Sequence, residues 1–281
     1  MTIVTVVQTL LRLMSGIVLA ALSIHSAGAQ PNCPLATLPA YAHNDYLNDR
    51  PLLDALSLGF RGVEVDVFLI DDTLRMGHDR RQASRAPAFE HTYLAPLRAR
   101  LADCARLTNL NDPFVLAVEI KESSPHTYHA LRALLAQYAE LFAIPEGATP
   151  NNAAPVDVIL VGWHPPLDAH FDSMSPPVVL GVQHRLSSDK ARVESLDPRV
   201  RLLSLDYGKT MGRWWRTRPA RQRWLGMLRD ARVAAPGRLM RVYNVPVDAR
   251  VYDELRDAGV DLLGTKQLEQ TQQLLRPGVT P

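Results

Sequence analysis

The run GVEVDV, residues 62–67, sets two carboxylates, Glu64 and Asp66, among apolar residues. Side chains two apart on a strand share one face, so these carboxylates would lie side by side and repel unless a cation neutralises them or one is protonated. A second apolar run, residues 114–121, ends with Glu119 and Lys121, which also share a face. Either pair alone could belong to a solvated sheet edge. Together, between apolar neighbours, Glu64, Asp66 and Glu119 predict a site for a hard divalent cation, Mg²⁺ or Ca²⁺.

Two histidines are candidates for proton transfer beside this site. His43 ends the apolar run 38–43, and His78 follows the short run Leu74–Met76. Imidazoles titrate near neutrality, so a pair on either side of a metal-held phosphate can act as general base and general acid. A single histidine at a strand end is more often structural. The neighbourhood of Glu64 and Asp66 favours the catalytic interpretation for both.

The elements that must position these residues alternate along the chain. Eight apolar runs predict strands: Leu38–His43, Gly62–Ile70, Phe114–Lys121, Val156–Gly162, Val178–Gln183, Arg201–Tyr207, Leu239–Val245 and Asp261–Thr265. Five stretches between them predict helices: Leu52–Leu58, Tyr93–Leu107, His126–Leu141, Trp214–Val233 and Val251–Ala258. This alternation indicates a parallel sheet, and eight units without a glycine-rich dinucleotide fingerprint favour a TIM-type (β/α)8 barrel over an open doubly wound sheet. In such a barrel, chemistry lies at the carboxyl ends of the strands.

Residues 1–29 predict a cleavable signal peptide. One charge, Arg12, precedes an apolar run from Met14 to Ile24, and the small-residue triplet 27–29 follows. The apolar run is shorter than the roughly 20 residues that span a bilayer, although a membrane anchor is the alternative. We therefore expect one domain, residues 30–281, exported to the periplasm or secreted after cleavage near Ala29. Its remaining length, about 250 residues, suits a single barrel.

Charge and cysteine content narrow the function classes. The formal net charge is only +2, which gives no support to nucleic-acid binding. Two cysteines, Cys33 and Cys104, could form a disulfide in an exported protein or remain buried free thiols. The segment Lys209–Arg232 is rich in Arg and Trp, which predicts either peripheral contact with anionic lipid or a solvated helix whose tryptophans pack on the barrel. No partner protein can be inferred.

The ordered set of His43, Glu64-Val65-Asp66, His78 and Glu119-Ile120-Lys121 resembles the superfamily of glycerophosphodiester phosphodiesterases and phosphatidylinositol-specific phospholipases C. The longer string from residue 42 to residue 79 resembles in particular the branch named for altered inheritance of mitochondria protein 6. The segment 257–265 is similar to the superfamily's final helix-to-strand turn, so the likeness extends over most of the chain.

This resemblance implies a TIM-type barrel, a divalent metal and hydrolysis of a phosphodiester. By matching position, Glu64, Asp66 and Glu119 would be the metal ligands, and His43 and His78 the acid–base pair. Lys121 would contact the phosphate. Glycerophosphodiesterases usually have Arg directly after the first His, where this chain has Asn44, an amide that can hydrogen-bond a phosphate without supplying charge.

We therefore expect a metal-dependent phosphodiesterase that acts on a glycerophosphodiester, a phospholipid headgroup or a related small diester. Two alternatives stay open. One is a phospholipase-D-like lyase that forms a cyclic phosphate, and the other is a non-catalytic barrel that binds lipid or a phosphorylated ligand. The polar residues that end the later strands, Gln183, Asp206, Tyr243 and Asn244, are weaker candidates for substrate contact.

Overall fold

Eight parallel strands close into a barrel in the computed structural model. The strands are β1 (Leu38–Ala42), β2 (Phe60–Ile70), β4 (Phe114–Ile120), β5 (Val156–Gly162), β6 (Leu180–Arg185), β7 (Val200–Asp206), β8 (Leu239–Tyr243) and β9 (Leu262–Thr265). Each pairs with the next, and β1 pairs with both β2 and β9, which closes the ring. The TIM-type (β/α)8 fold predicted from the sequence is thus confirmed.

The structure describes residues 33, 36–104, 106–108, 113–142, 154–168, 180–186, 195–210 and 217–276. They belong to a unit that runs from Cys33 to Pro281, and the expected signal peptide lies outside the described residues. None of the described helices combines the length and the apolar character needed to cross a membrane.

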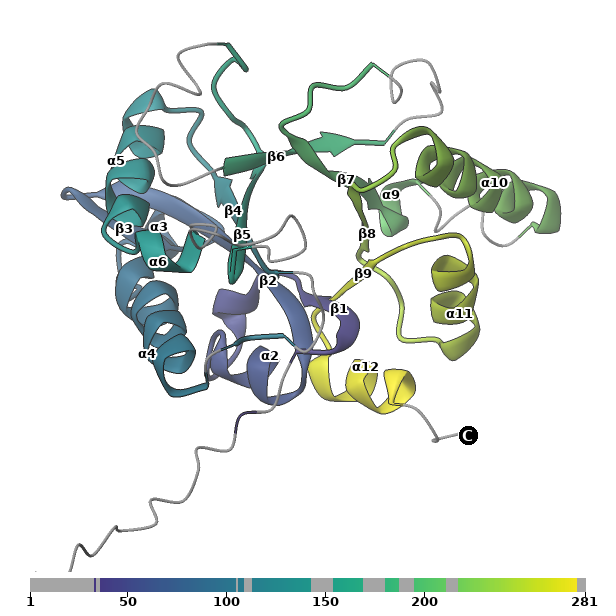
Figure 1. Ribbon diagram of the computed structural model, residues 1–281, viewed down its shortest axis with the longest axis horizontal. Coiled ribbons are helices and arrows are strands. Elements are labelled where there is room, and N and C mark those ends of the chain that lie inside the picture. The colour runs from purple at the N-terminus through teal and green to yellow at the C-terminus, as the bar shows by residue number, and fades with distance from the viewer. Residues whose placement is uncertain are drawn as a thin grey trace, which may run out of the picture. The chain divides into compact units, whose positions relative to one another are not determined.

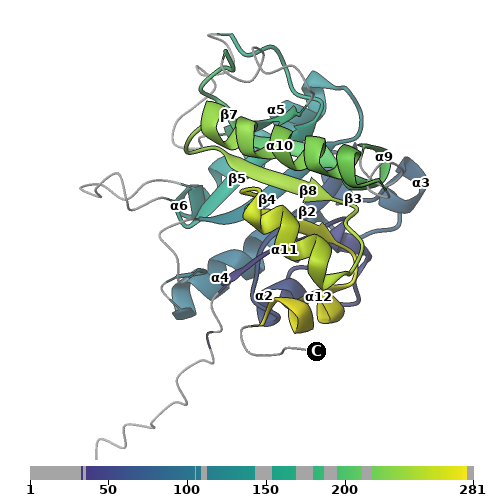
Figure 2. The same ribbon diagram turned by 90° about the vertical axis from the view of Figure 1, so that its right-hand side faces the viewer.

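Helices surround the strands, as Figures 1 and 2 show from two directions. They are α2 (Leu53–Ser57), α3 (Arg80–Ala83), α4 (Ala95–Cys104), α5 (Pro125–Ala136), α6 (Ala139–Phe142), α9 (Tyr207–Thr210), α10 (Arg218–Ala234), α11 (Ala249–Asp257) and α12 (Leu268–Leu275), with a 3-10 turn at Asp45–Leu47 and a π-helical turn at Glu90–Leu94. Side-chain caps fix where three of them begin, because Asp79 accepts from the N–H of Gln82, Ser124 from that of Thr127 and Asp248 from that of Val251.

An antiparallel hairpin extends β2 beyond the parallel register. Its second strand, β3 (Thr73–Met76), pairs with residues 67–70 of β2. Asp71 and Asp72 form the two-residue turn, and both have positive φ, the geometry that matches the right-handed twist of a hairpin. This strand was not predicted from the sequence, because two aspartates are a weaker turn signal than Asn-Gly or Asp-Gly.

The strands bury a core on each face. The outward face, with Val63, Leu116 and Val158, packs against helix residues such as Leu131 and Leu255. The inward face forms a separate apolar cluster of Tyr41, Val115, Ala117, Ile159, Val161, Leu202 and Leu262. Because side chains alternate along a strand, the residues that are in register with Val115 and Ala117 on neighbouring strands also point into the barrel interior.

Cys33 and Cys104 are joined by a disulfide, which links the segment before β1 to the last residue of α4. Of the alternatives left open for this pair, the bridge is the one present in the structure. The expected helix Tyr93–Leu107 corresponds to the π-helical turn followed by α4, which ends at this cysteine.

Candidate functional site

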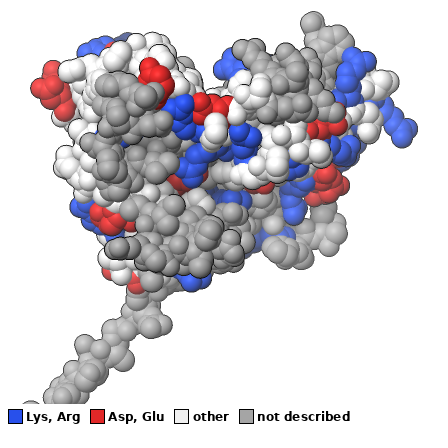
Figure 3. Space-filling model, turned by 45° about the horizontal axis from the view of Figure 1, so that its top comes forward, with Lys and Arg blue, Asp and Glu red and all other residues white. Residues whose placement is uncertain are grey.

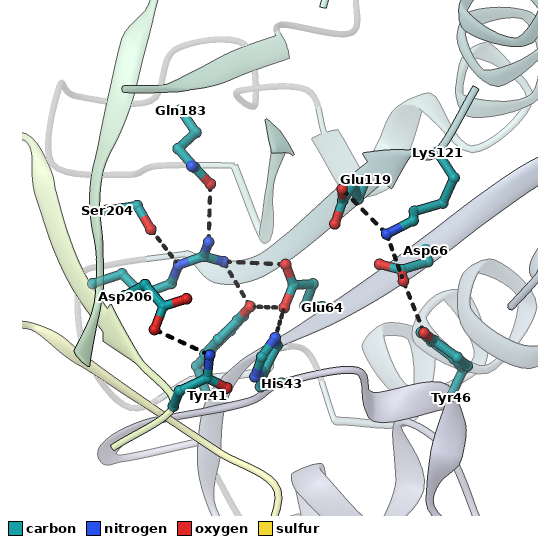
Figure 4. Close-up of polar contacts among 12 residues, drawn as sticks. Tyr41, His43, Tyr46, Glu64, Asp66, Glu119, Lys121, Gln183, Ser204 and Asp206 are labelled. Atoms are coloured by element: carbon teal, nitrogen blue, oxygen red, sulfur yellow. Dashed lines mark hydrogen bonds and ion pairs between the residues drawn. The ribbon is translucent and has the colours of Figure 1, made fainter. Parts of the chain in front are cut away.

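Three carboxylates from two neighbouring strands meet inside the barrel. Strand register aligns Glu64 of β2 with Ala117 of β4, and Asp66 with Glu119. Because Ala117 belongs to the interior cluster, all three acidic side chains take the interior side. Glu64, Asp66 and Glu119 each offer an oxygen, and these oxygens lie within 4.8 Å of one another. Figure 4 shows the three side chains converging.

Asp66 provides the test of whether this cluster suits a cation. Its side chain is 1 % exposed, and its buried Oδ1 has no hydrogen-bond partner. Its Oδ2 accepts from the Tyr46 hydroxyl at 2.8 Å. Burial and the neighbouring charge of Glu119 raise the pKa of Asp66 above its usual range. A buried carboxylate oxygen without a donor, beside two further carboxylates, is the donor set that a hard divalent cation requires.

Gly162 makes room for the third carboxylate. It ends β5, beside Ile120 of β4, with φ of +73°, and a Cβ added there would come within 3.1 Å of the Glu119 side chain. Glycine therefore satisfies both the backbone conformation and the space that Glu119 needs to reach the cluster.

Lys121 places its ammonium group between two of the carboxylates. Its Nζ lies 3.4 Å from Glu119 Oε1 and 3.5 Å from Asp66 Oδ2. Burial alone would lower the pKa of Lys121, but Asp66 and Glu119 outweigh burial and raise it, so the amine is charged near neutral pH. This half-buried cation is available to an anionic group that approaches the cluster.

His43 lies against the same cluster from the end of β1. Its Nε2 is 3.3 Å from Glu64 Oε2, and its ring meets the Tyr243 ring edge-on at 5.2 Å between centroids. Burial lowers the pKa of His43, and the Glu64 carboxylate opposes that shift, whereas Lys266 and Arg241 add to it. Burial therefore favours the neutral form of this imidazole.

His78 lies on the exposed rim, at the start of the turn that leads into α3. The N–H of the preceding residue, Gly77, donates to the backbone oxygen of Asp66. This part of the chain is therefore hydrogen-bonded to β2, the strand that carries two of the three carboxylates. The N–H of His78 donates to Gln82 Oε1, while its side chain is exposed. No contact between its ring and the carboxylate cluster is present among the described residues.

Asn44 stands directly beside His43 in a left-handed conformation. Its φ is +53°, and its side chain is largely buried. The loop that follows is held by Asp45, whose buried carboxylate accepts from the Leu52 N–H at 2.6 Å and from the Tyr93 hydroxyl at 2.9 Å. Burial raises the pKa of Asp45 to about 6, and these donors oppose the shift. Asp45 thus fixes the loop that presents His43 and Asn44.

A cavity of about 380 Å³ opens beside His43. Residues from the ends of β8 and β9 and from α9 line it: His43, Tyr207, Gly208, Asn244, Val245, Pro246, Gly264, Thr265, Lys266 and Gln267. Asn244 donates to Asp206 Oδ1 at 3.2 Å, which fixes one wall. The cavity has room for an organic group attached to a phosphate near the cluster.

Several polar residues near the carboxylates were not predicted from the sequence: Tyr41, Ser204 and Arg241 on the strands, and Tyr46 in the 3-10 turn after β1. Arg241 lies two residues before Tyr243 in a strand that is otherwise mostly apolar, and the side-chain alternation would have turned it inward with Tyr243. Gln183, expected at the rim, accepts instead from Arg241 inside the barrel.

The Arg- and Trp-rich segment is only partly described, since residues 211–216 lie outside the described ranges. In α10, Trp224 packs against the core, while Arg218, Arg223 and Arg229 are exposed. On the face that Figure 3 presents, basic and acidic side chains are interspersed, in keeping with the small net charge of +2.

Two curated proteins are similar to this chain. The altered inheritance of mitochondria protein 6 homolog of Arthroderma benhamiae is 34% identical over 87 residues, which is 29% of this chain and 26% of that protein. Altered inheritance of mitochondria protein 6 of Eremothecium gossypii is 31% identical over 97 residues, 34% of this chain and 25% of that protein. The matched segments thus span about a quarter of each relative.

Solved structures support the fold. A glycerophosphodiester phosphodiesterase from Agrobacterium tumefaciens aligns with a TM-score of 0.50 at 13% identity, over 85% of this chain and 99% of its own. A phosphodiesterase from Oleispira antarctica, solved with the product sn-glycerol-3-phosphate, has a TM-score of 0.50 at 14% identity, over 84% and 96%. At such identities the likeness shows only the shared barrel.

The family comparison gives a more specific result. The model of the AIM6-like phosphodiesterase domain matches residues 33–143, a segment that contains both histidines and all three carboxylates of the site. This segment is less than half of the chain, and over it the sequence is similar to the AIM6-like phosphodiesterase domain and to the two altered inheritance of mitochondria proteins.

Proposed function

We propose that the protein is a metal-dependent phosphoric diester hydrolase that acts on a glycerophosphodiester, a phospholipid headgroup or a similar small diester. The observation that supports it most is the convergence of Glu64, Asp66 and Glu119 around the unpartnered Asp66 Oδ1, beside His43, within the segment that matches a phosphodiesterase domain. The likeness to glycerophosphodiesterase barrels agrees with this proposal at the level of the fold.

The proposed chemistry divides among the residues of the site. A divalent cation held by the three carboxylates would supply Lewis-acid neutralisation of charge on the non-bridging phosphate oxygens. Lys121, and the amide of Asn44, would hold the phosphate. One imidazole of the pair His43 and His78 accepts a proton from the attacking water. The other donates a proton to the leaving alkoxide as its bond to phosphorus breaks.

The decisive experiment measures hydrolysis of bis(p-nitrophenyl) phosphate with Mg²⁺, Ca²⁺, Mn²⁺ or EDTA. We expect turnover that depends on a divalent cation and that His43→Ala or His78→Ala lowers by at least about a hundredfold, the usual contribution of general acid–base catalysis. Asp66→Asn should lose both turnover and stabilisation by the cation, because the amide is a poorer ligand of the same shape.

Asp157→Asn is the matched control for Asp66→Asn. Asp157 is also a buried carboxylate of the barrel, but it lies near the start of β5 and pairs with Arg201 at 2.8 Å. Its variant should keep turnover and the cation-induced rise in melting temperature. Folded protein without turnover of any diester in a broad panel would reject the proposal in favour of a binding barrel. If ³¹P NMR spectra show that a cyclic phosphate accumulates, the enzyme is a lyase and not a hydrolase.

We also propose that the protein acts after export, in the periplasm or outside the cell. The Cys33–Cys104 disulfide supports this location, because such bonds persist in oxidising compartments. We further propose that the exposed arginines of α10 make peripheral contact with anionic lipid. Measuring binding to phosphatidylglycerol vesicles would test this.

A further inference from the structure

A guanidinium group lies buried in the middle of the barrel. The Arg241 side chain, on β8, is 3 % exposed. Its Nε donates to Ser204 Oγ at 3.0 Å, and one terminal nitrogen donates to Gln183 Oε1 at 2.9 Å. Figure 4 shows these side chains, with Tyr41, pointing at one guanidinium. These two hydrogen bonds come from β7 and β6, and the guanidinium also lies over the Tyr41 ring of β1, 4.9 Å from its centroid.

The guanidinium reaches Glu64 through a tyrosine. Arg241 Nη1 donates to the Tyr41 hydroxyl oxygen at 2.6 Å, and that hydroxyl donates its own proton to Glu64 Oε2. The same Nη1 lies 3.6 Å from Glu64 Oε1, an ion pair without a hydrogen bond. Gly264 accommodates the arrangement, because a Cβ there would lie 3.0 Å from the Tyr41 ring and 2.7 Å from the Cβ of Tyr243.

The two oxygens of Glu64 therefore have different partners. Oε2 accepts a hydrogen bond from the Tyr41 hydroxyl and faces His43 Nε2 at 3.3 Å, whereas Oε1 accepts no hydrogen bond from the described residues. A carboxylate can only accept, so a hydrogen bond across this 3.3 Å contact requires the proton of a neutral His43 on Nε2. His43 Nδ1, which is buried and has no hydrogen-bond partner, is then the nitrogen that carries the lone pair.

We propose that Arg241 is a positioning residue: through Tyr41 it orients Glu64, so that Oε2 fixes the tautomer of His43 and Oε1 remains for the cation. This inference rests on the proposed function and deepens it, because it assigns Glu64 to the imidazole as well as to the metal. Charge alone would not achieve this orientation. The forked guanidinium binds Ser204, Gln183 and Tyr41 at once, which a single ammonium group cannot reproduce.

Two variants that preserve formal charge test the proposal. Tyr41→Phe removes one oxygen and breaks the link between Arg241 and Glu64. Arg241→Lys keeps the positive charge but loses the fork. The matched control is Arg201→Lys on neighbouring β7, where the arginine pairs with Asp157 at 2.8 Å away from the cluster. Circular dichroism establishes whether each variant is folded. If Arg241→Lys does not fold, the milder change, Tyr41→Phe, decides the test.

The readouts are the tautomer of His43, the affinity for Mn²⁺ and the two kinetic constants. With ¹⁵N-labelled histidine, and His43→Gln to assign the signal, wild type should show His43 protonated on Nε2 alone, and both variants a mixture of tautomers. Calorimetry should give Mn²⁺ dissociation constants about tenfold higher in both variants, the usual effect of losing an outer partner of a metal ligand. The constant kcat should fall more than KM rises. Arg201→Lys should match wild type throughout.

A wild-type tautomer and wild-type Mn²⁺ affinity in folded Tyr41→Phe would overturn the proposal. Failure of the proposed function would look different. If wild type neither binds Mn²⁺ nor hydrolyses a diester, yet its fixed His43 tautomer is lost in the two variants, the positioning role stands and the hydrolase assignment falls.

Discussion

At the residue scale, Asp157 is a buried carboxylate that can be compared with those of the site. Only one of its two oxygens, Oδ2, pairs with a cation, the guanidinium of Arg201. Its Oδ1 is buried without a hydrogen-bond partner. Burial raises the pKa of Asp157 to about 6, and the charge of Arg201 opposes that shift without cancelling it. The folded protein therefore disfavours the ionised form of this residue.

Asp157 gives the unfolding free energy a predictable dependence on pH. Its folded-state pKa is raised, so its stabilising contribution is fully present below about pH 4, the unfolded pKa, and is lost as pH rises through about 6. The loss amounts to at most about 3 kcal/mol. Asp157→Asn should remove this decrease, which urea unfolding at a series of pH values would measure. An unchanged pH profile in the variant would contradict the assignment.

Side-chain alternation alone predicted which carboxylates converge, since Glu64, Asp66 and Glu119 follow from period-two strands. Alternation also places Arg241 on the same face as Tyr243, but it does not reveal what Arg241 contacts. Its partner Tyr41 is 200 residues away in the sequence, and only closure of the barrel brings β1 beside β8 through β9. An arginine in an apolar strand is equally compatible with a solvated strand end.

At the element scale, the loop between β1 and α2 combines two unusual backbone positions. Asn44 and Leu52 have φ of +53° and +63°, and Asp45 ties them together by accepting from the Leu52 N–H. Leucine rarely adopts such a conformation, so the loop depends on the buried Asp45 carboxylate to hold it. The sequence marked this segment as a connection that carries one candidate phosphate contact, Asn44. In the structure, Asp45 holds the loop that directly follows His43.

Substitutions at Asn44 separate its conformational role from substrate contact. Asn44→Ala should lower the unfolding free energy by about 1 kcal/mol, because alanine disfavours positive φ, whereas Asn44→Gly should change it by less than half of that. Under the proposed function, both variants lose the amide and should raise KM for the diester similarly. If Asn44→Gly keeps the wild-type KM, the amide does not contact the substrate. Chemical denaturation and steady-state kinetics provide the two measurements.

The elements themselves followed closely from the sequence. All eight parallel strands were predicted, with ends within about two residues of those observed. The hairpin strand β3 and the final helix α12 were not, since β3 has four residues and α12 turns a mixed face of Leu268, Thr271, Gln272 and Leu275 inward. Short or partly polar buried faces give a weak periodic signal.

At the scale of the whole molecule, the disulfide restrains the start of the barrel. Cys33 and Cys104 are 71 residues apart, and a bridge over such a loop reduces the entropy of the unfolded chain. The double substitution Cys33→Ser with Cys104→Ser should lower the unfolding free energy by about 2–4 kcal/mol. Turnover should persist below the melting temperature, because neither cysteine contacts the carboxylate cluster. Loss of turnover in folded protein would instead link the bridge to the site.

The ring order of the strands carries one more consequence. β1 needs β9 on one side, and β9 does not exist until residue 265 has been synthesised. A nascent chain that stops short of Leu262 therefore presents two bare hydrogen-bonding edges, on β1 and on β8, and such edges recruit other strands. Messages truncated near their 3′ end should accordingly yield aggregates and not a weakened enzyme, so the last tenth of the chain controls whether the ribosome's product is soluble.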